Sequence, residues 1–513
     1  MVLDDQTTIT YVDHNERIIH DAKKIAKNTG IFGGAEIFHR IVQFVSGIII
    51  TRVVGASIYG IYTTGITVLF FLQIAGTMGL SKGVVRYIGL YKREQDKATG
   101  IIISGLLIAF LSGAILAGLL YFGANYLANS IFCMPTLKWV LQWLAASLPA
   151  SVLIIVGSEC IRGFQNIKGY VVIQKLLLPL GSLILIVCLF LLGFKLRGLV
   201  LRDVVVGWLV ALVTMFLLYR TFPGAFQWKT AIYTEIGDLV RFSLPLAFAE
   251  ILFVLLLRID VMMIAAFLDP QKVGIYGVVL RLARLILTPL VAIDAIVLPI
   301  LAEYMGRNSS EDVQRIYKLS VHWALMMVLP IFVISTVYSE FLLGLFGEDF
   351  IAGSLCFIII ACGYLTRATV GSISGVLLMG GKSRLILYNM IIFLGLNIPL
   401  NFILIRYWGI TGVAFATGLI MALHALVMLV EAKIIFDIQL PLTEILKFMG
   451  IGSPILLLMY MLRVSRVVPS PTLNFIVGVF SILILYGIGL IKMRLITMED
   501  KAVIGTLLSQ FRK

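Results

Sequence analysis

Residues 33–62, GGAEIFHRIVQFVSGIIITRVVGASIYGIY, decide the fold of this chain. The stretch is apolar and longer than the roughly 20 residues that a helix needs to cross a bilayer. It nevertheless carries Glu36 and Arg40, charges that lipid tolerates poorly. Glu36, Arg40 and Gln43 share one helix face because they stand four and seven residues apart. The stretch therefore predicts a membrane helix with one charged face turned toward protein or water.

The same features recur later in the sequence. A shift of 214 residues places the run AEI at 35–37 on AEI at 249–251, and GIY at 60–62 on GIY at 274–276, with no gap between the two matches. A repeat of this length is typical of the two halves of a polytopic membrane protein rather than of a solenoid. We therefore expect a duplicated membrane unit with an acid at the same depth in each copy.

The composition agrees with a membrane protein. Of 513 residues, 60% are apolar and only 13% are charged, about half of the charged fraction of a soluble domain. The net charge is +14, and in such a chain Lys and Arg are expected in cytoplasmic loops beside anionic membrane lipid rather than on nucleic acid. Five cysteines show no metal-ligand or disulfide spacing, so we expect no metal.

Apolar runs predict about fourteen transmembrane helices in an all-α integral membrane protein. Their predicted ranges are 30–54, 61–80, 99–123, 137–161, 170–194, 199–220, 241–267, 274–300, 318–346, 352–379, 385–405, 409–432, 446–463 and 472–492. An even number places both termini on one side, and the distribution of Lys and Arg places that side in the cytoplasm. The expected location is the cytoplasmic (plasma) membrane.

The repeat divides these helices into two pseudo-symmetric six-helix lobes, which share one orientation because six is even. Helices 13 and 14 have no counterpart in the repeat. The predicted divisions are a cytoplasmic polar segment 1–29, an N-lobe 30–222, a C-lobe 223–435, a C-terminal helix pair 436–492 and a cytoplasmic tail 493–513.

Charged side chains fall inside the predicted helices of both lobes. A charge at the bilayer centre costs at least about 2.5–3.5 kcal/mol, so such groups face a protein interior or a watery cavity. We expect a cationic cleft between the lobes, and its candidate substrate-binding residues are Arg40, Arg258, Arg281, Arg284 and Arg367. Guanidinium groups pair bidentately with phosphate oxygens, which predicts an anionic substrate. The alternative is that these arginines only pair with Glu36, Glu250, Asp260 or Asp294 and hold helices together.

Four runs resemble one transporter family. They are VGASIYGIY at 54–62, GLSKGVVRYIGLYKRE at 79–94, SECIRGFQNIKGY at 158–170, and RFSLPLAFAEILFVLLLRIDVMMIAAFLDPQKVGIY at 241–276. In this order they resemble the polysaccharide-export branch of the multidrug/oligosaccharidyl-lipid/polysaccharide (MOP) superfamily. Fourteen helices also fit the flippases of this branch, which include O-antigen flippases, better than the related twelve-helix multidrug exporters.

The resemblance implies a flippase that moves a polyprenyl pyrophosphate-linked oligosaccharide across the membrane by alternating access, not an enzyme. The expected partners are then the lipid-linked oligosaccharide, membrane lipid and glycan-assembly proteins, with the chain acting as a monomer. Two alternatives stay open: an ion-coupled multidrug exporter of the same superfamily, and a membrane-embedded glycan polymerase or ligase. The second lacks the sizeable outer loop that glycan chemistry would require.

The acids inside the helices are candidates for coupling transport to an ion. They are Glu36, Glu250, Asp260 and Asp294. Glu250 is the strongest candidate because no basic residue stands three or four positions away, whereas Glu36 has Arg40 one turn away. The sequence has no Walker motif. We therefore expect no cofactor, and energy from H⁺, Na⁺ or the membrane potential.

Overall fold

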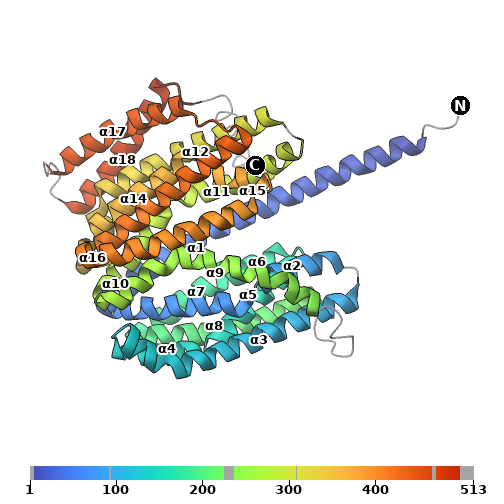
Figure 1. Ribbon diagram of the computed structural model, residues 1–513, viewed down its shortest axis with the longest axis horizontal. Helices are drawn as coiled ribbons and strands as arrows, with labels where there is room; N and C mark the ends of the chain where they lie inside the picture. The colour runs from blue at the N-terminus through green and yellow to red at the C-terminus, as the bar shows by residue number, and fades with distance from the viewer. Residues whose placement is uncertain (1–4, 92–93, 224–235, 308, 465–469, 497–513) are drawn as a thin grey trace. The chain divides into compact units, whose positions relative to one another are not determined.

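The computed structural model describes residues 5–91, 94–223, 236–307, 309–464 and 470–496, with side chains from residue 33 onward. These residues form helices and turns with no strand (Figure 1), which confirms the predicted all-α class. Contacts divide the chain into two compact units. Unit 1 comprises Met1–Val54 and Ile61–Val254, and unit 2 comprises Gly55–Gly60 and Leu255–Lys513. The lobe limits predicted from the sequence remain predictions, because residues 224–235 at their border lie outside the described ranges.

The helices follow one another with short turns. Up to and including the helix that contains the border at Val254, they are α1 (Asp5–Thr77), α2 (Leu80–Tyr91), α3 (Gln95–Tyr126), the π-helical turn η1 (Leu127–Ile131), α4 (Pro135–Ala145), α5 (Leu148–Gly163), α6 (Ile167–Val171), the π-helical turn η2 (Val172–Leu177), α7 (Leu178–Leu191), α8 (Leu196–Thr221) and α9 (Ile236–Phe267). After the border they are α10 (Pro270–Ile286), α11 (Thr288–Gly306), α12 (Ser310–Val337), α13 (Ser339–Gly344), the 3₁₀ turn η4 (Glu348–Gly353), α14 (Ser354–Thr369), α15 (Ile373–Met379), α16 (Ser383–Phe436), α17 (Leu442–Val464) and α18 (Pro471–Lys492).

Two of these helices each contain a break at a glycine. In α1 the backbone leaves helical angles at Gly55, with φ 76° and ψ 171°, and in α16 it does so at Gly409, with φ 56° and ψ −134°. Glycine adopts positive φ without the steric cost that a β-carbon brings. Each of these long helices therefore stands for two of the predicted spans.

Ten described helices are long and apolar enough to cross a membrane, or eleven when the bent pair α4–α5 counts as one span. Splitting the spans at Gly55 and Gly409 adds two, and α9, with 32 residues, is also longer than the membrane is thick. This agrees with the predicted architecture of about fourteen transmembrane helices. The chain is a multi-pass membrane protein.

Three spans predicted as continuous are broken in the structure. Helices α4 and α5 are bent by 46°, α10 and α11 meet at Leu287, and α14 and α15 are separated by residues 370–372. The predicted ranges 137–161, 274–300 and 352–379 therefore each contain two helices. In the first two ranges the second helix begins at a proline, Pro149 in α5 and Pro289 in α11, as the kinking effect of proline inside a span predicts.

The segment after helix 2 is a further correction. The predicted spans 61–80 and 99–123 leave residues 81–98 without a helix, whereas α2 runs from Leu80 to Tyr91. Leu80, Val84 and Ile88 are fully buried and stand four residues apart, which forms an apolar stripe on one helix face. Burial of this apolar face stabilises a helix in spite of the charged residues in the segment.

The two copies of the repeated GIY motif contact each other within unit 2. A β-carbon at Gly274 would lie 2.1 Å from the carbonyl oxygen of Ala56 and 3.1 Å from the backbone nitrogen of Gly60. A β-carbon at Gly60 would lie 1.7 Å from the carbonyl oxygen of Pro270. Small residues allow membrane helices to approach this closely, so the glycine in each copy of the motif is needed for packing.

The C-terminal helix pair packs on α12. Leu329 of α12 lies where a β-carbon at Gly452 of α17 would be, at 2.9 Å. Tyr486 of α18 donates a 3.4 Å hydrogen bond to the carbonyl oxygen of Leu325, and Tyr338 donates one of 3.2 Å to that of Asn474. The helices that lack a counterpart in the repeat are thus attached to α12 and also to α13, where Glu340 pairs with Arg463.

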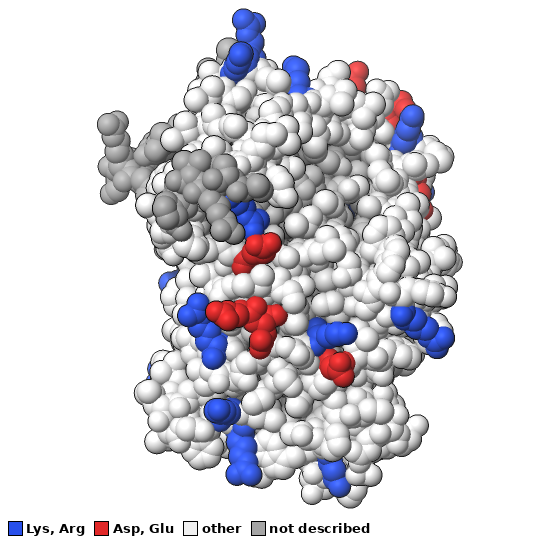
Figure 2. All heavy atoms as spheres, turned by 90° about the vertical axis from the view of Figure 1, so that its left-hand side faces the viewer, with Lys and Arg blue, Asp and Glu red and all other residues white. Residues whose placement is uncertain are grey.

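Charged side chains are sparse on the surface. The face in Figure 2 is mostly uncharged, with isolated basic and acidic side chains. Large apolar side chains of the spans are exposed, among them Phe122 at 84% and Leu191 at 83%. Such a surface suits contact with lipid tails rather than with water.

Candidate functional site

Three of the five predicted arginines gather in unit 2. Arg258 comes from α9, and Arg281 and Arg284 come from α10, three residues apart and so on one helix face. Arg258 lies within electrostatic reach of both. The guanidinium of Arg281 lies 5.8 Å from the ring centroid of Tyr59, close enough for a cation–π contact. We call Arg258, Arg281 and Arg284 the arginine cluster.

The acid beside the arginine cluster is turned toward the protein interior. Asp260 is 3% exposed and accepts hydrogen bonds from its neighbour's backbone, Val261 N at 2.8 Å, and from the Tyr276 hydroxyl at 3.0 Å. Tyr276 belongs to the second GIY motif, so the motif also fixes this carboxylate. Asp260 lies within electrostatic reach of Arg258 and Arg284, and Arg258 lies within reach of Arg281, so the cluster holds more guanidinium groups than Asp260 alone balances.

The cluster lies next to a broken span. Arg284 is in the last turn of α10, one turn before α11 begins at Thr288. The Thr288 hydroxyl donates a 3.4 Å hydrogen bond to the carbonyl oxygen of Arg284. Broken membrane helices recur where transporters bind their substrates, since a break leaves backbone groups available at membrane depth. The arginine cluster therefore lies beside a break between two helices of unit 2.

Arg367 is the fourth predicted arginine that lies in unit 2, and it stabilises the break between α14 and α15. Arg367, at the end of α14, donates to the carbonyl oxygen of Gly371 at 2.7 Å and to the Ser374 hydroxyl at 3.0 Å. Gly371 has φ +53°, so the chain turns sharply here before α15. Arg367 thus closes the gap between α14 and α15 with its own hydrogen bonds.

Asp294 belongs to the same break. Its carboxylate accepts a 2.5 Å hydrogen bond from the Ser372 hydroxyl, and it lies within electrostatic reach of Arg367. The backbone nitrogen of Ser372 donates to the Ser320 hydroxyl of α12 at 3.2 Å. The structure therefore brings Asp294 and Arg367 together at the α14–α15 break.

In unit 1, Glu36 is shared by two bases. The Nε of Arg40 donates to Glu36 Oε1 at 3.0 Å, one turn along α1, as the sequence spacing suggested. Lys175 Nζ lies 2.7 Å from Glu36 Oε2. Sequence reasoning missed Lys175 as a site residue, although its position inside the predicted helix 170–194 was a usable signal. Lys175 stands in the π-helical turn η2, a local distortion that is frequent at functional sites.

Glu250 has a different environment from Glu36. Its carboxylate accepts from the Ser81 hydroxyl at 3.2 Å, and Ser81 lies in the GLSKG run of α2. The glycines on either side of this run pack on α9: a β-carbon at Gly79 would lie 2.1 Å from the carbonyl oxygen of Ser243, and one at Gly83 2.1 Å from its hydroxyl oxygen. The motif thus holds α2 against α9 and presents Ser81 to Glu250.

The predicted site residues accordingly fall into separate groups. Arg258, Arg281 and Arg284 lie with Asp260, Arg367 lies with Asp294, Arg40 lies with Glu36 and Lys175, and Glu250 lies with Ser81. The predicted convergence of all five arginines remains a prediction. The arginine cluster is the group with the greatest excess of positive charge over acid.

A many-helix membrane bundle with broken spans and charged side chains at membrane depth is the architecture of a secondary transporter. Its fold is that of the MOP superfamily. The structure matches the lipid II flippase MurJ in an inward closed conformation with a TM-score of 0.72, at 16% identity over 90% of this chain and 98% of that chain. It matches the inward-facing conformation of a multidrug resistance MATE family transporter with a TM-score of 0.67, at 16% identity over 78% of this chain and 94% of that chain.

The chain belongs to the polysaccharide biosynthesis protein family, whose sequence profile matches residues 25–305. The MatE profile matches residues 245–403. A curated relative, the probable low-salt glycan biosynthesis flippase Agl15 of Haloferax volcanii, is 27% identical over 166 residues. That match spans 32% of this chain and 35% of the relative, about a third of each. The resemblance inferred from the four sequence runs is confirmed.

Proposed function

We propose that this chain is a flippase, not an enzyme, which moves a lipid-linked (polyprenyl pyrophosphate) oligosaccharide across the cytoplasmic membrane by alternating access. The observation that carries the proposal is the arginine cluster, in which Arg258 lies within electrostatic reach of Arg281, Arg284 and Asp260. The family match and the partial match to Agl15 support the same substrate class. Glycan-assembly proteins as partners, action as a monomer and cytoplasmic termini belong to the same proposal.

The chemistry of the cluster suits a pyrophosphate. Placing one charged side chain at the bilayer centre costs at least about 2.5–3.5 kcal/mol of free energy. Binding of an anion during part of the transport cycle would offset this cost for the arginines of the cluster. Arginine stays charged and offers a planar fork of donors that matches phosphate oxygens. A lipid-linked sugar supplies such a headgroup together with a tail that remains in the bilayer.

The two remaining predicted arginines would have to leave particular protein groups before they could bind substrate. Arg40 would have to exchange Glu36 for substrate, and Arg367 would have to leave the carbonyl oxygen of Gly371. We propose that Arg40 meets the substrate in one conformation and that Arg367 acts mainly by holding the α14–α15 break in shape. Loss of Arg367 should then reduce stability together with transport.

We propose that an ion gradient or the membrane potential drives transport, with no cofactor. Among the candidate acids, Glu250 has a hydroxyl partner in Ser81, whereas Glu36 is neutralised by Arg40 and Lys175. Transport by Glu250→Gln under imposed H⁺ or Na⁺ gradients tests this choice. A mutant that still responds to gradients as the parent does would eliminate Glu250 as the coupling residue.

A multidrug exporter is the second candidate because the MatE profile matches residues 245–403. The arginine cluster argues against it, since a positively charged site repels cationic drugs. Reconstituted protein separates the two functions: uptake of a polyprenyl pyrophosphate oligosaccharide supports the flippase, and uptake of a cationic dye supports the exporter.

The decisive experiment removes one guanidinium at a time. In vesicles containing the purified chain, Arg258→Ala, Arg281→Ala and Arg284→Ala should each lower transport about 10- to 150-fold, because a hydrogen bond to a charged group contributes about 1.5–3 kcal/mol. The matched control is Arg307→Ala, since Arg307 is exposed and pairs only with Glu303 on the helix surface. Parent-like transport in all three cluster variants, at normal expression, would overturn the proposal.

A further inference from the structure

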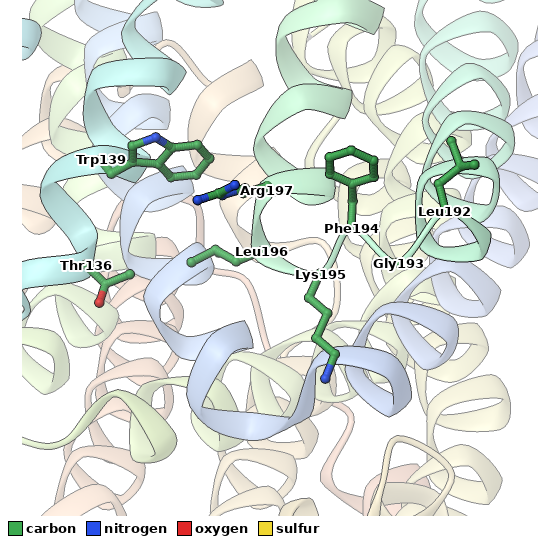
Figure 3. Close-up of a pocket in the computed structure, with 8 residues that line it drawn as sticks. All are labelled: Thr136, Trp139, Leu192, Gly193, Phe194, Lys195, Leu196 and Arg197. Carbon is green, nitrogen blue, oxygen red and sulfur yellow. The ribbon is translucent and has the colours of Figure 1, made fainter.

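A pocket lies at the end of unit 1 where α7 turns into α8. Its volume is about 580 Å³. One wall is the first turn of α4 and the other is the α7–α8 turn, as Figure 3 shows. The lining residues are Thr136, Trp139, Leu192, Gly193, Phe194, Lys195, Leu196 and Arg197.

The pocket is at the depth of the lipid headgroups. The helical segment Ile167–Leu191, which ends with α7, and helix α8 are both long and apolar enough to cross a membrane, so the turn that joins them emerges at the membrane surface. Trp139 stacks at a tilt on Trp143, with ring centroids 6.0 Å apart, and tryptophan is enriched at this level of membrane proteins. Leu191 and Leu192, which enter the turn, are 83% and 71% exposed, as expected of side chains that face lipid tails.

The charge of the pocket is positive and not balanced by acids. Lys195 and Arg197 line it, and neither has a hydrogen-bond or ion-pair partner among the described residues. Between Asp96 and Asp203 the sequence has a single acid, Glu159. Glu159 pairs with Arg162, and at the helical rise per residue it stands about 30 Å along the chain from Trp139.

We propose that this pocket binds the phosphate headgroup of an anionic membrane phospholipid. Arg197, beside Trp139, holds the phosphate oxygens, and Lys195 attracts the anion from the other side of the α7–α8 turn, while Leu191 and Leu192 guide the acyl chains along α7. Figure 3 shows Arg197 beside Trp139 on one side of the pocket and Lys195 extending from the turn. The site is separate from the arginine cluster, which lies in unit 2, and it does not depend on the proposed function.

The position of the charges on the chain also favours this ligand. The predicted topology places the α7–α8 turn on the outer side, where Lys and Arg are normally scarce. Lys195 and Arg197 are an exception to this rule, and they lie beside aromatic residues of the membrane interface. Binding of an anionic lipid explains the exception, because each base near an anionic surface strengthens binding roughly fivefold.

The test titrates the purified full chain in detergent with phosphatidylglycerol and with phosphatidylcholine, and follows thermal unfolding. Phosphatidylglycerol should stabilise the parent more than phosphatidylcholine does. The double variant Lys195→Ala/Arg197→Ala should respond to roughly 30-fold higher phosphatidylglycerol concentrations. Lys195→Arg/Arg197→Lys should retain the response. The matched control is Lys138→Ala, a basic residue of α4 that does not line the pocket.

Three outcomes would overturn the proposal. The first is a double alanine variant that responds to phosphatidylglycerol as the parent does, and the second is equal stabilisation of the parent by both lipids. The third is loss of the phosphatidylglycerol effect in the presence of equimolar polyprenyl pyrophosphate or inorganic pyrophosphate, which would assign the pocket to the transported lipid or to free anions instead.

Discussion

The contact between the two GIY motifs makes Gly274→Ala the most informative single change. The new methyl group would lie 2.1 Å from the carbonyl oxygen of Ala56 and 3.1 Å from the nitrogen of Gly60. Both are backbone atoms, so relief requires the helices to separate by about 1 Å rather than a side chain to rotate. Overpacking of this kind costs about 1–3 kcal/mol.

The matched control is Gly118→Ala in α3, where the added methyl group meets nothing within 4 Å. Both variants gain the same helix propensity, roughly 0.8–1 kcal/mol, so this gain cancels in the comparison. Unfolding of the two proteins in the same mild detergent, by heat or by added denaturing detergent, should place Gly274→Ala lower in stability by the full overpacking cost. Equal stability of the two variants would show that the glycine contact is not needed for packing.

Three further changes test individual contacts through the same unfolding measurement. Arg367→Ala should destabilise the protein by about 1–3 kcal/mol because the carbonyl oxygen of Gly371 loses its donor; no loss would mean that Arg367 does not hold the break. Tyr62→Phe should cost about 1–2 kcal/mol, since its hydroxyl donates to Asp203 at 2.7 Å, and an unchanged stability would contradict that bond. Glu303→Ala should cost less than about 0.5 kcal/mol because its ion pair is exposed, and a larger loss would reveal a contact beyond this pair.

Much of the fold could be predicted from the sequence because a bilayer imposes simple rules on length and charge. Apolar runs of sufficient length located the spans, and the AEI and GIY repeats indicated the duplication. The breaks at Leu287 and Gly371 could not be predicted in the same way. The break at Leu287 has a local signal in Pro289 at the start of α11, whereas the break at Gly371 depends on tertiary contacts such as that of Ser372 with Ser320.

The candidate site was predicted in part. Charges inside the spans identified Arg258, Arg281 and Arg284, and the structure places these three together. The partners of the other charged residues could not be read from spacing. Lys175 approaches Glu36 from a helix about 140 residues away, and such a pair depends on tertiary packing alone.

The attachment of α17 and α18 to α12 has a consequence for the size of the fold. In water, removal of two helices would expose the apolar surface of Leu325 and Leu329, but in a bilayer lipid tails would cover that surface at little cost. The hydrogen bonds that would be lost, such as the one from Tyr338 to Asn474, are mostly near helix ends, where water can replace them. The surrounding lipid can thus substitute for the helix pair, so a chain ending after α16 should keep a stable core.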